Sequence, residues 1–84
     1  PQDERLAVAL AKWVVRTKTR SFNGRDLYRS KAIPGIGSAE TMKAAAAHLI
    51  EGNWLFAHER SEGVKGRARI DYVVNQKVFE RVRS

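Results

Sequence analysis

The spacing of the apolar residues changes near residue 53, and this change limits the folds open to the chain. Before that point apolar side chains recur every three or four residues, which is the period of an α-helix. Beyond it they recur at every second residue, which is typical of β-strands. Helices followed by strands predict an α+β protein, in which a helical core is covered by an antiparallel hairpin.

Two helices are predicted before the first proline-glycine turn. The first covers residues 3–18, with acidic residues at its start and basic residues near its end, as the helix dipole favours. Ser21 and Phe22 follow as a short extended piece. The second helix covers residues 24–31, and Asn23 is its expected N-cap.

A third helix is predicted after the turn at 33–35, where Pro34 and Gly35 cannot continue a helix. It covers residues 38–51, with Ser38 as N-cap and with Gly52 or Asn53 as the left-handed residue that ends it. Its expected buried stripe consists of Met42, Ala45, Ala46, Leu49 and Ile50.

Strands are predicted over residues 53–60 and 68–75, joined by a loop with two glycines. In the second strand Ile70, Tyr72 and Val74 share one face. The segment after residue 75 is either a final helical turn or two or a trailing segment, and its apolar residues, Val78 and Phe79, are expected to pack on the body.

This order of elements is that of a winged helix-turn-helix, with a three-helix core and a two- or three-stranded β-hairpin wing. We expect residues 1–84 to form a single domain. Because the chain begins at Pro1 without a methionine, we also expect it to be a piece of a larger protein.

The charge of the chain points to a polyanionic partner. It carries 16 Lys and Arg against 9 Asp and Glu, a net charge of +7 with a pI near 10.4. Such a bias favours nucleic acid, or alternatively an anionic membrane surface. Apolar runs are too short for a membrane span and no signal peptide is evident, so we expect a cytoplasmic protein without membrane contact. The absence of cysteine excludes disulfides and thiolate metal sites.

Three segments resemble one family. They read "RDLYRSKAIPGI" at 25–36, "AAAAHLIEGNWL" at 44–55 and "DYVVNQKVF" at 71–79. Together they are similar to the winged-helix domain at the carboxyl end of bacterial primase/helicase-like replication proteins of plasmids and prophages. Two positions depart from the family's pattern, Asn53 before Trp54 and Gln76 where a proline is common. The resemblance implies a DNA-binding or docking module attached to an ATPase or primase.

The expected DNA contacts follow from how a winged helix binds DNA. The third helix would enter the major groove, the second would cross the backbone, and the wing would touch the backbone or the minor groove. The DNA-binding candidates are Arg25, Arg29, Lys31, Ser38, Thr41, Lys43, Lys65, Arg67 and Arg69. Ser38 has a plain N-cap role as its alternative. Asp71 continues the face of Arg67 and Arg69 and is expected to neutralise it in part.

The outer face of the third helix predicts weak sequence reading. It has no arginine or asparagine to bind a base edge, and Glu40 and Glu51 would repel phosphates. We therefore expect a backbone-directed grip on double-stranded or forked DNA. The alternatives are a protein partner or self-association on the alanine-rich face, with Ala44 and Ala47, and a transcriptional regulator.

No enzyme chemistry is expected in these residues. His48 and His58 lack the further ligands of a metal site, and "GVKG" lacks the ending of a phosphate-binding P-loop. We predict no catalytic residue, no metal and no cofactor.

Overall fold

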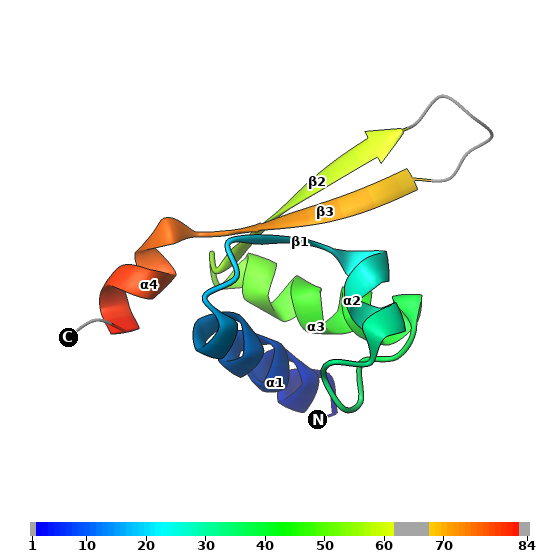
Figure 1. The fold of residues 1–84 in the computed structure, drawn as a ribbon, viewed down its shortest axis with the longest axis horizontal. Coiled ribbons are helices and arrows are strands. Elements are labelled where there is room, and N and C mark those ends of the chain that lie inside the picture. The colour runs from blue at the N-terminus through cyan, green and yellow to red at the C-terminus, as the bar shows by residue number, and fades with distance from the viewer. Residues whose placement is uncertain (1, 62–67, 83–84) are drawn as a thin grey trace.

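A three-stranded antiparallel sheet with helices packed against it makes up the computed structural model, which describes residues 2–61 and 68–82 (Figure 1). Along these residues the elements are α1 (Gln2–Thr17), β1 (Ser21–Asn23), α2 (Gly24–Ser30), α3 (Ala39–Glu51), β2 (Leu55–Ser61), β3 (Ala68–Val74) and α4 (Gln76–Val82). The predicted α+β class and the predicted order of elements are confirmed.

The described residues form one helix more than the three that were predicted. The segment after residue 75 forms α4, which settles the choice between a helical turn or two and a trailing segment. Val78 is buried and Phe79 packs against the core, as predicted. α4 lies at the opposite end of the sheet from Ser61, where β2 ends, and Ala68, where β3 begins (Figure 1).

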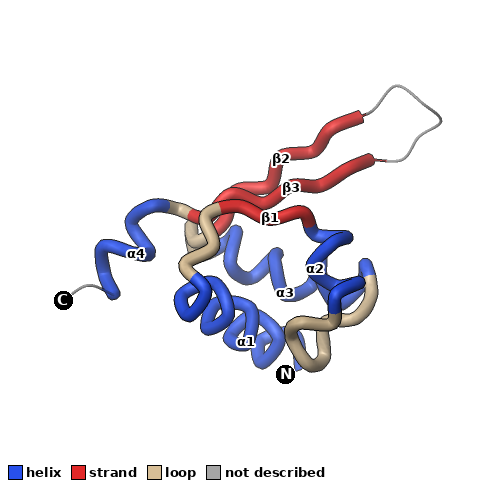
Figure 2. Tube along the Cα trace, in the orientation of Figure 1, coloured by secondary structure: helices blue, strands red, loops and turns tan. Residues whose placement is uncertain are grey.

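The central strand of the sheet is β3. The strand order of the sheet is β1-β3-β2, and both pairings are antiparallel. Phe22 in β1 lies opposite Tyr72, while Leu55 and Ser61 at the two ends of β2 lie opposite Val74 and Ala68. β2 and β3 continue beyond the helices, whereas α1, α2 and α3 gather below one face of the sheet (Figure 2).

The core lies between α1, α3 and that face of the sheet. Leu10 and Val14 of α1 meet Met42 of α3 and Leu55 of β2, and all four are almost fully buried. Burying a side chain of this size contributes roughly 1.5–3 kcal/mol relative to leaving it exposed. No polar or charged residue is buried among residues with a described side chain, so apolar packing holds this part together.

Phe22 connects α1 to the sheet. Its ring centroid lies 5.8 Å from that of Trp13 in an edge-to-face arrangement and 5.3 Å from that of Tyr72 at a tilt of 32°. Both separations fall in the range that aromatic pairs prefer. The short strand β1 therefore fixes the first helix against the central strand.

The predicted helix ends are confirmed by their hydrogen bonds. Asn23 Oδ1 accepts from the Asp26 amide over 2.9 Å, which caps α2. At the end of α3, Asn53 adopts a φ of 63° and is the left-handed residue. The Trp54 amide donates to the Leu49 carbonyl oxygen and the Asn53 amide to that of Ile50, the two bonds of a Schellman motif.

The predicted buried stripe of α3 is wrong at Ile50. This residue was expected to be buried, but its side chain is 37% exposed. It lines a shallow depression with Ala47 and Ala57, on the side of α3 that faces the β2–β3 pair. The alanines are too short to cover it, so the buried stripe of α3 ends at Leu49.

Candidate nucleic-acid interface

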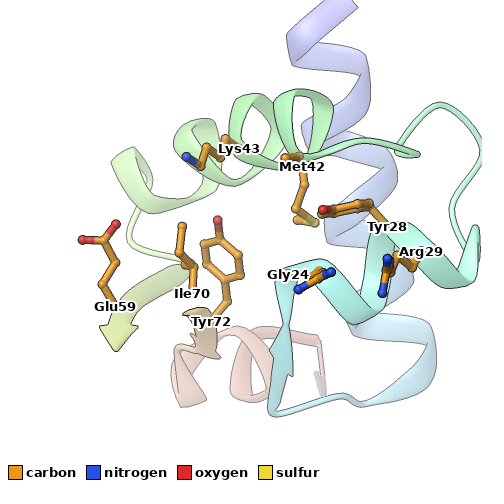
Figure 3. A pocket seen from close by; sticks show the side chains of 10 residues that line it. Gly24, Tyr28, Arg29, Met42, Lys43, Glu59, Ile70 and Tyr72 are labelled. Carbon is orange, nitrogen blue, oxygen red and sulfur yellow. The ribbon is translucent and has the colours of Figure 1, made fainter. Parts of the chain in front are cut away.

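A groove lies between α2, α3 and strands β2 and β3, and it holds a cavity of about 350 Å³ (Figure 3). Three predicted DNA-binding residues line it, Arg25 and Arg29 from α2 and Lys43 from α3. All three are exposed, and none is within ion-pair distance of a carboxylate in the part of the chain that the structure describes. The fold thus gathers cations from two helices on one surface.

Helix periodicity explains why these cations share the groove. Arg25 and Arg29 are four residues apart, so they project from the same face of α2. Lys43 lies four residues after Ala39, which also lines the groove. Lys43 therefore reaches the groove from the first turns of α3, on the same face as Ala39.

The turn between α2 and α3 is fixed against α1. Ile33 and Ile36 are buried, and the Ile36 amide donates to the Ile33 carbonyl oxygen over 3.1 Å. Gly35 has a φ of +92°, and a Cβ there would lie 2.8 Å from Leu6 Cδ2. Both the backbone conformation and the lack of space require glycine here. The relative position of α2 and α3, and so the spacing of the cations, depends on this turn.

Tyrosines stand on two sides of the groove. Tyr28 comes from α2 and Tyr72 from β3, with Met42 and Ile70 supplying apolar surface between the helices and the sheet (Figure 3). Neither tyrosine was among the predicted DNA-binding residues. The sequence did contain a signal that could have placed them at the interface. Tyr28 lies one turn after Arg25, on the same side of α2, and Tyr72 shares a face of β3 with Ile70.

Tyr72 stays neutral over the physiological range. Its side chain is 3% exposed, and burial raises the pKa of its hydroxyl above the ordinary value. The carboxylate of Glu59, which also lines the groove, raises this pKa further. The hydroxyl therefore remains a hydrogen-bond donor and acceptor at the groove wall.

Ser38 and Thr41 form the N-terminal cap of α3. Ser38 Oγ accepts from the Thr41 amide over 3.2 Å, and Thr41 Oγ1 accepts from the Ser38 amide over 3.1 Å. Thr41 Oγ1 also accepts from the Gly37 amide over 3.2 Å. The cap role of Ser38 is confirmed, and the partner in the capping box is a threonine. A contact of these hydroxyls with phosphate stays a prediction.

The remaining predicted cations lie elsewhere. Lys31 is exposed, ends α2 in a left-handed conformation and is not among the residues lining the groove. Arg69 lies on the face of β3 opposite to Ile70, and its Nε is 3.6 Å from Asp71 Oδ1, so the predicted partial neutralisation is confirmed for Arg69. Lys65 and Arg67 fall outside the described residues.

Acidic residues limit the positive charge of this side of the molecule. Glu40 and Glu51 of α3 are exposed, as predicted. Glu59 of β2 lines the groove itself and was not among the predicted acidic residues. With three cations and one carboxylate, the groove keeps a net positive charge from its lining residues.

A second groove lies between α1 and the end of α3, and it is mainly apolar. It has a volume of about 610 Å³ and is lined by Val8, Ala11 and Val15 of α1 together with Leu49 and Trp54. Val8 is 51% exposed. This surface is separate from the first groove, the cationic groove that Arg25, Arg29 and Lys43 line. The two share no lining residue.

Neither metal binding nor membrane crossing is evident in the residues that the structure describes. They contain no cluster of three or more His, Asp or Glu side chains suited to a metal ion. Both His48 and His58 are exposed. None of the described helices combines the length and apolar character needed to cross a bilayer.

The chain matches no protein-family model, no curated protein and no solved structure.

Proposed function

We propose that this chain is a winged helix-turn-helix domain that binds DNA mainly through the phosphate backbone, in a replication or mobile-element protein of the cytoplasm. The observation that carries the proposal is the groove that Arg25, Arg29 and Lys43 line together. Phosphate neutralisation by such side chains supplies most of the sequence-independent affinity of DNA-binding proteins.

The order of the elements supports the fold part of this proposal. A helix, a short strand and two helices are followed by two long strands. In the sheet β3 lies between β1 and β2 and pairs with both. In this assignment α2 and α3 are the helix-turn-helix and β2 with β3 is the wing. The start of α3 would approach base edges while α2 follows the backbone.

The composition of α3 supports weak sequence specificity. Between Ala39 and Glu51 it has no arginine and no asparagine, and Lys43 is its one basic residue besides His48. Arginine and asparagine make the bidentate contacts that distinguish guanine and adenine. Backbone contacts position a protein on DNA without reading its sequence.

A titration series tests this function. Binding of duplex, single-stranded and forked DNA of unrelated sequences would be measured by fluorescence anisotropy at several salt concentrations. We expect similar affinities for unrelated duplexes, and a slope of log affinity against log salt near −4 to −5 for about five neutralised phosphates. Affinity that does not change with salt, or strong preference for one duplex sequence, would contradict a backbone-directed grip.

A second candidate function is docking of a protein, either a partner or another copy of this chain. The apolar groove between α1 and α3, with Val8 half exposed, favours it. Val8→Glu would place a charge in that groove, and Ala47→Glu would place one on the exposed alanine face of α3. Sedimentation velocity over a concentration range tests self-association, which either substitution should abolish if its face is the contact.

A further inference from the structure

The groove contains more than a row of cations. It deepens into the cavity of about 350 Å³, which lies at the small end of the range for ligand pockets, roughly 300–1,000 Å³. Met42 in its wall is 2% exposed overall, and Ile70 adds further apolar surface. A phosphate backbone needs cations on a surface but not an apolar cavity beside them. The cavity therefore suits a group attached to that backbone that has both apolar and polar surface.

The polar groups of the cavity suit the same kind of group. Tyr28 and Tyr72 come from different elements and lie on two sides of it (Figure 3). Within residues 2–61 and 68–82 neither hydroxyl has a hydrogen-bond partner. Glu59 adds an acceptor at the edge. The edge of a nucleobase carries donors and acceptors that such groups can bind.

The two tyrosine side chains differ in how tightly they are packed. Tyr72 is fixed by its contact with Phe22, with 5.3 Å between ring centroids, and is almost fully buried. Tyr28 is only half buried and belongs to the same helix as Arg25 and Arg29. A base stacked on Tyr28 would keep its flanking phosphates within reach of these arginines. Stacking of a base on an aromatic side chain tolerates any sequence, because every base has a π-face.

We propose that this cavity receives one unstacked DNA base from a single-stranded or frayed segment, with Tyr28 as the stacking residue and the cations Arg25, Arg29 and Lys43 on the adjacent phosphates. This inference rests on the proposed DNA-binding function and extends it, because it gives the domain a reason to prefer forks and single strands over closed duplex.

Photocrosslinking locates the base directly. A forked DNA with 5-iodouracil in its single-stranded arm would be irradiated with the protein, digested with trypsin and analysed by mass spectrometry. We expect crosslinks in the peptide 26–29, which contains Tyr28, or in 70–77, which contains Tyr72. Ala39→Phe should abolish them, since Ala39 lines the cavity and a ring there would fill its mouth. Ala32→Phe is the matched control at an exposed position that does not line the cavity, and it should leave the crosslinks intact.

Affinity measurements provide the second test. Tyr28→Ala should weaken binding of single-stranded and forked DNA by about five-fold or more and that of closed duplex by less than about two-fold. Tyr28→Phe keeps the ring and should retain at least half of the affinity. Circular dichroism and thermal unfolding of each variant would verify that it is folded.

The outcomes separate this inference from the proposed function. Salt-dependent DNA binding without crosslinks in either peptide, and with equal losses on duplex and fork for Tyr28→Ala, overturns the base-binding cavity and leaves the DNA-binding function standing. Absence of binding to every DNA overturns the proposed function and this inference together.

Discussion

Gly24 and Tyr72 are packed so closely that a Cβ on the glycine would lie 2.9 Å from Tyr72 Cε2. The contact joins the first residue of α2 to the central strand, and it sets one wall of the cationic groove. The Tyr72 ring has little freedom to withdraw, because its other neighbour is Phe22.

Gly24→Ala should therefore destabilise the fold. Overpacking of a well-filled site costs roughly 1–3 kcal/mol, and urea unfolding would show this as a lower midpoint with an unchanged slope. Gly37→Ala is the matched control, because nothing lies within 4 Å of the position of its Cβ. Equal midpoints for the two variants would show that Tyr72 adjusts without cost.

Ser38→Ala should lower stability by about 1 kcal/mol through loss of the α3 cap. Ser38→Asp keeps a capping oxygen and should preserve stability, while its negative charge next to a bound phosphate should weaken DNA binding. Unfolding and DNA titration of both variants distinguish the cap from the phosphate contact. If Ser38→Asp binds DNA as tightly as the parent chain, the start of α3 lies away from the backbone.

Tyr72 should make stability depend on pH in the alkaline range. The folded-state pKa is raised, so unfolding releases a proton once the pH exceeds the ordinary tyrosine pKa of 10.0. The stabilisation is complete below that pH and is lost as the pH rises through the folded-state pKa. Tyr72→Phe removes this contribution, and its stability should fall less between pH 9 and pH 11, roughly one unit either side of that value. If the free energy of unfolding falls equally with pH in the parent chain and in Tyr72→Phe, Tyr72 makes no such contribution.

Charge reversal of the predicted wing cations, Lys65, Arg67 and Arg69, should weaken DNA binding less than reversal of the groove cations. Arg69 already pairs with Asp71, on the face of β3 opposite to Ile70 and the groove. Anisotropy titrations at one low salt concentration compare the two triple variants. A larger loss for the wing variant would make the β2–β3 pair the main DNA surface.

The elements were predictable because local signals determine them. Asn23, Ser38 and Asn53 mark helix ends by their own side-chain and backbone preferences. The first two were predicted as N-caps, and Asn53 was one of two candidates, with Gly52, for the left-handed residue that ends α3. Alternation likewise predicted that Ile70, Tyr72 and Val74 share one face of β3, and in the structure this is the face that packs on the core. These signals depend on neighbours within a few residues.

The groove was not predictable because it depends on contacts between distant segments. The pairing of β1 with β3 joins residues about 50 positions apart, as in Phe22 with Tyr72, and it places Tyr72 beside Gly24. The same packing decides that Ile50 is left exposed. Periodicity identifies which face of an element is buried, but not which neighbour covers it.

The central claim is that Arg25, Arg29 and Lys43 bind the DNA backbone, and the salt dependence of affinity tests it most directly. The triple reversal to Glu would be compared with reversal of Arg5, Lys12 and Arg16, three exposed cations of α1. Both variants change the net charge equally, so a general loss of attraction affects them alike. We predict that the groove variant loses about three units of slope in log affinity against log salt, while the α1 variant keeps the parent slope. Equal slopes for the two variants would contradict the account.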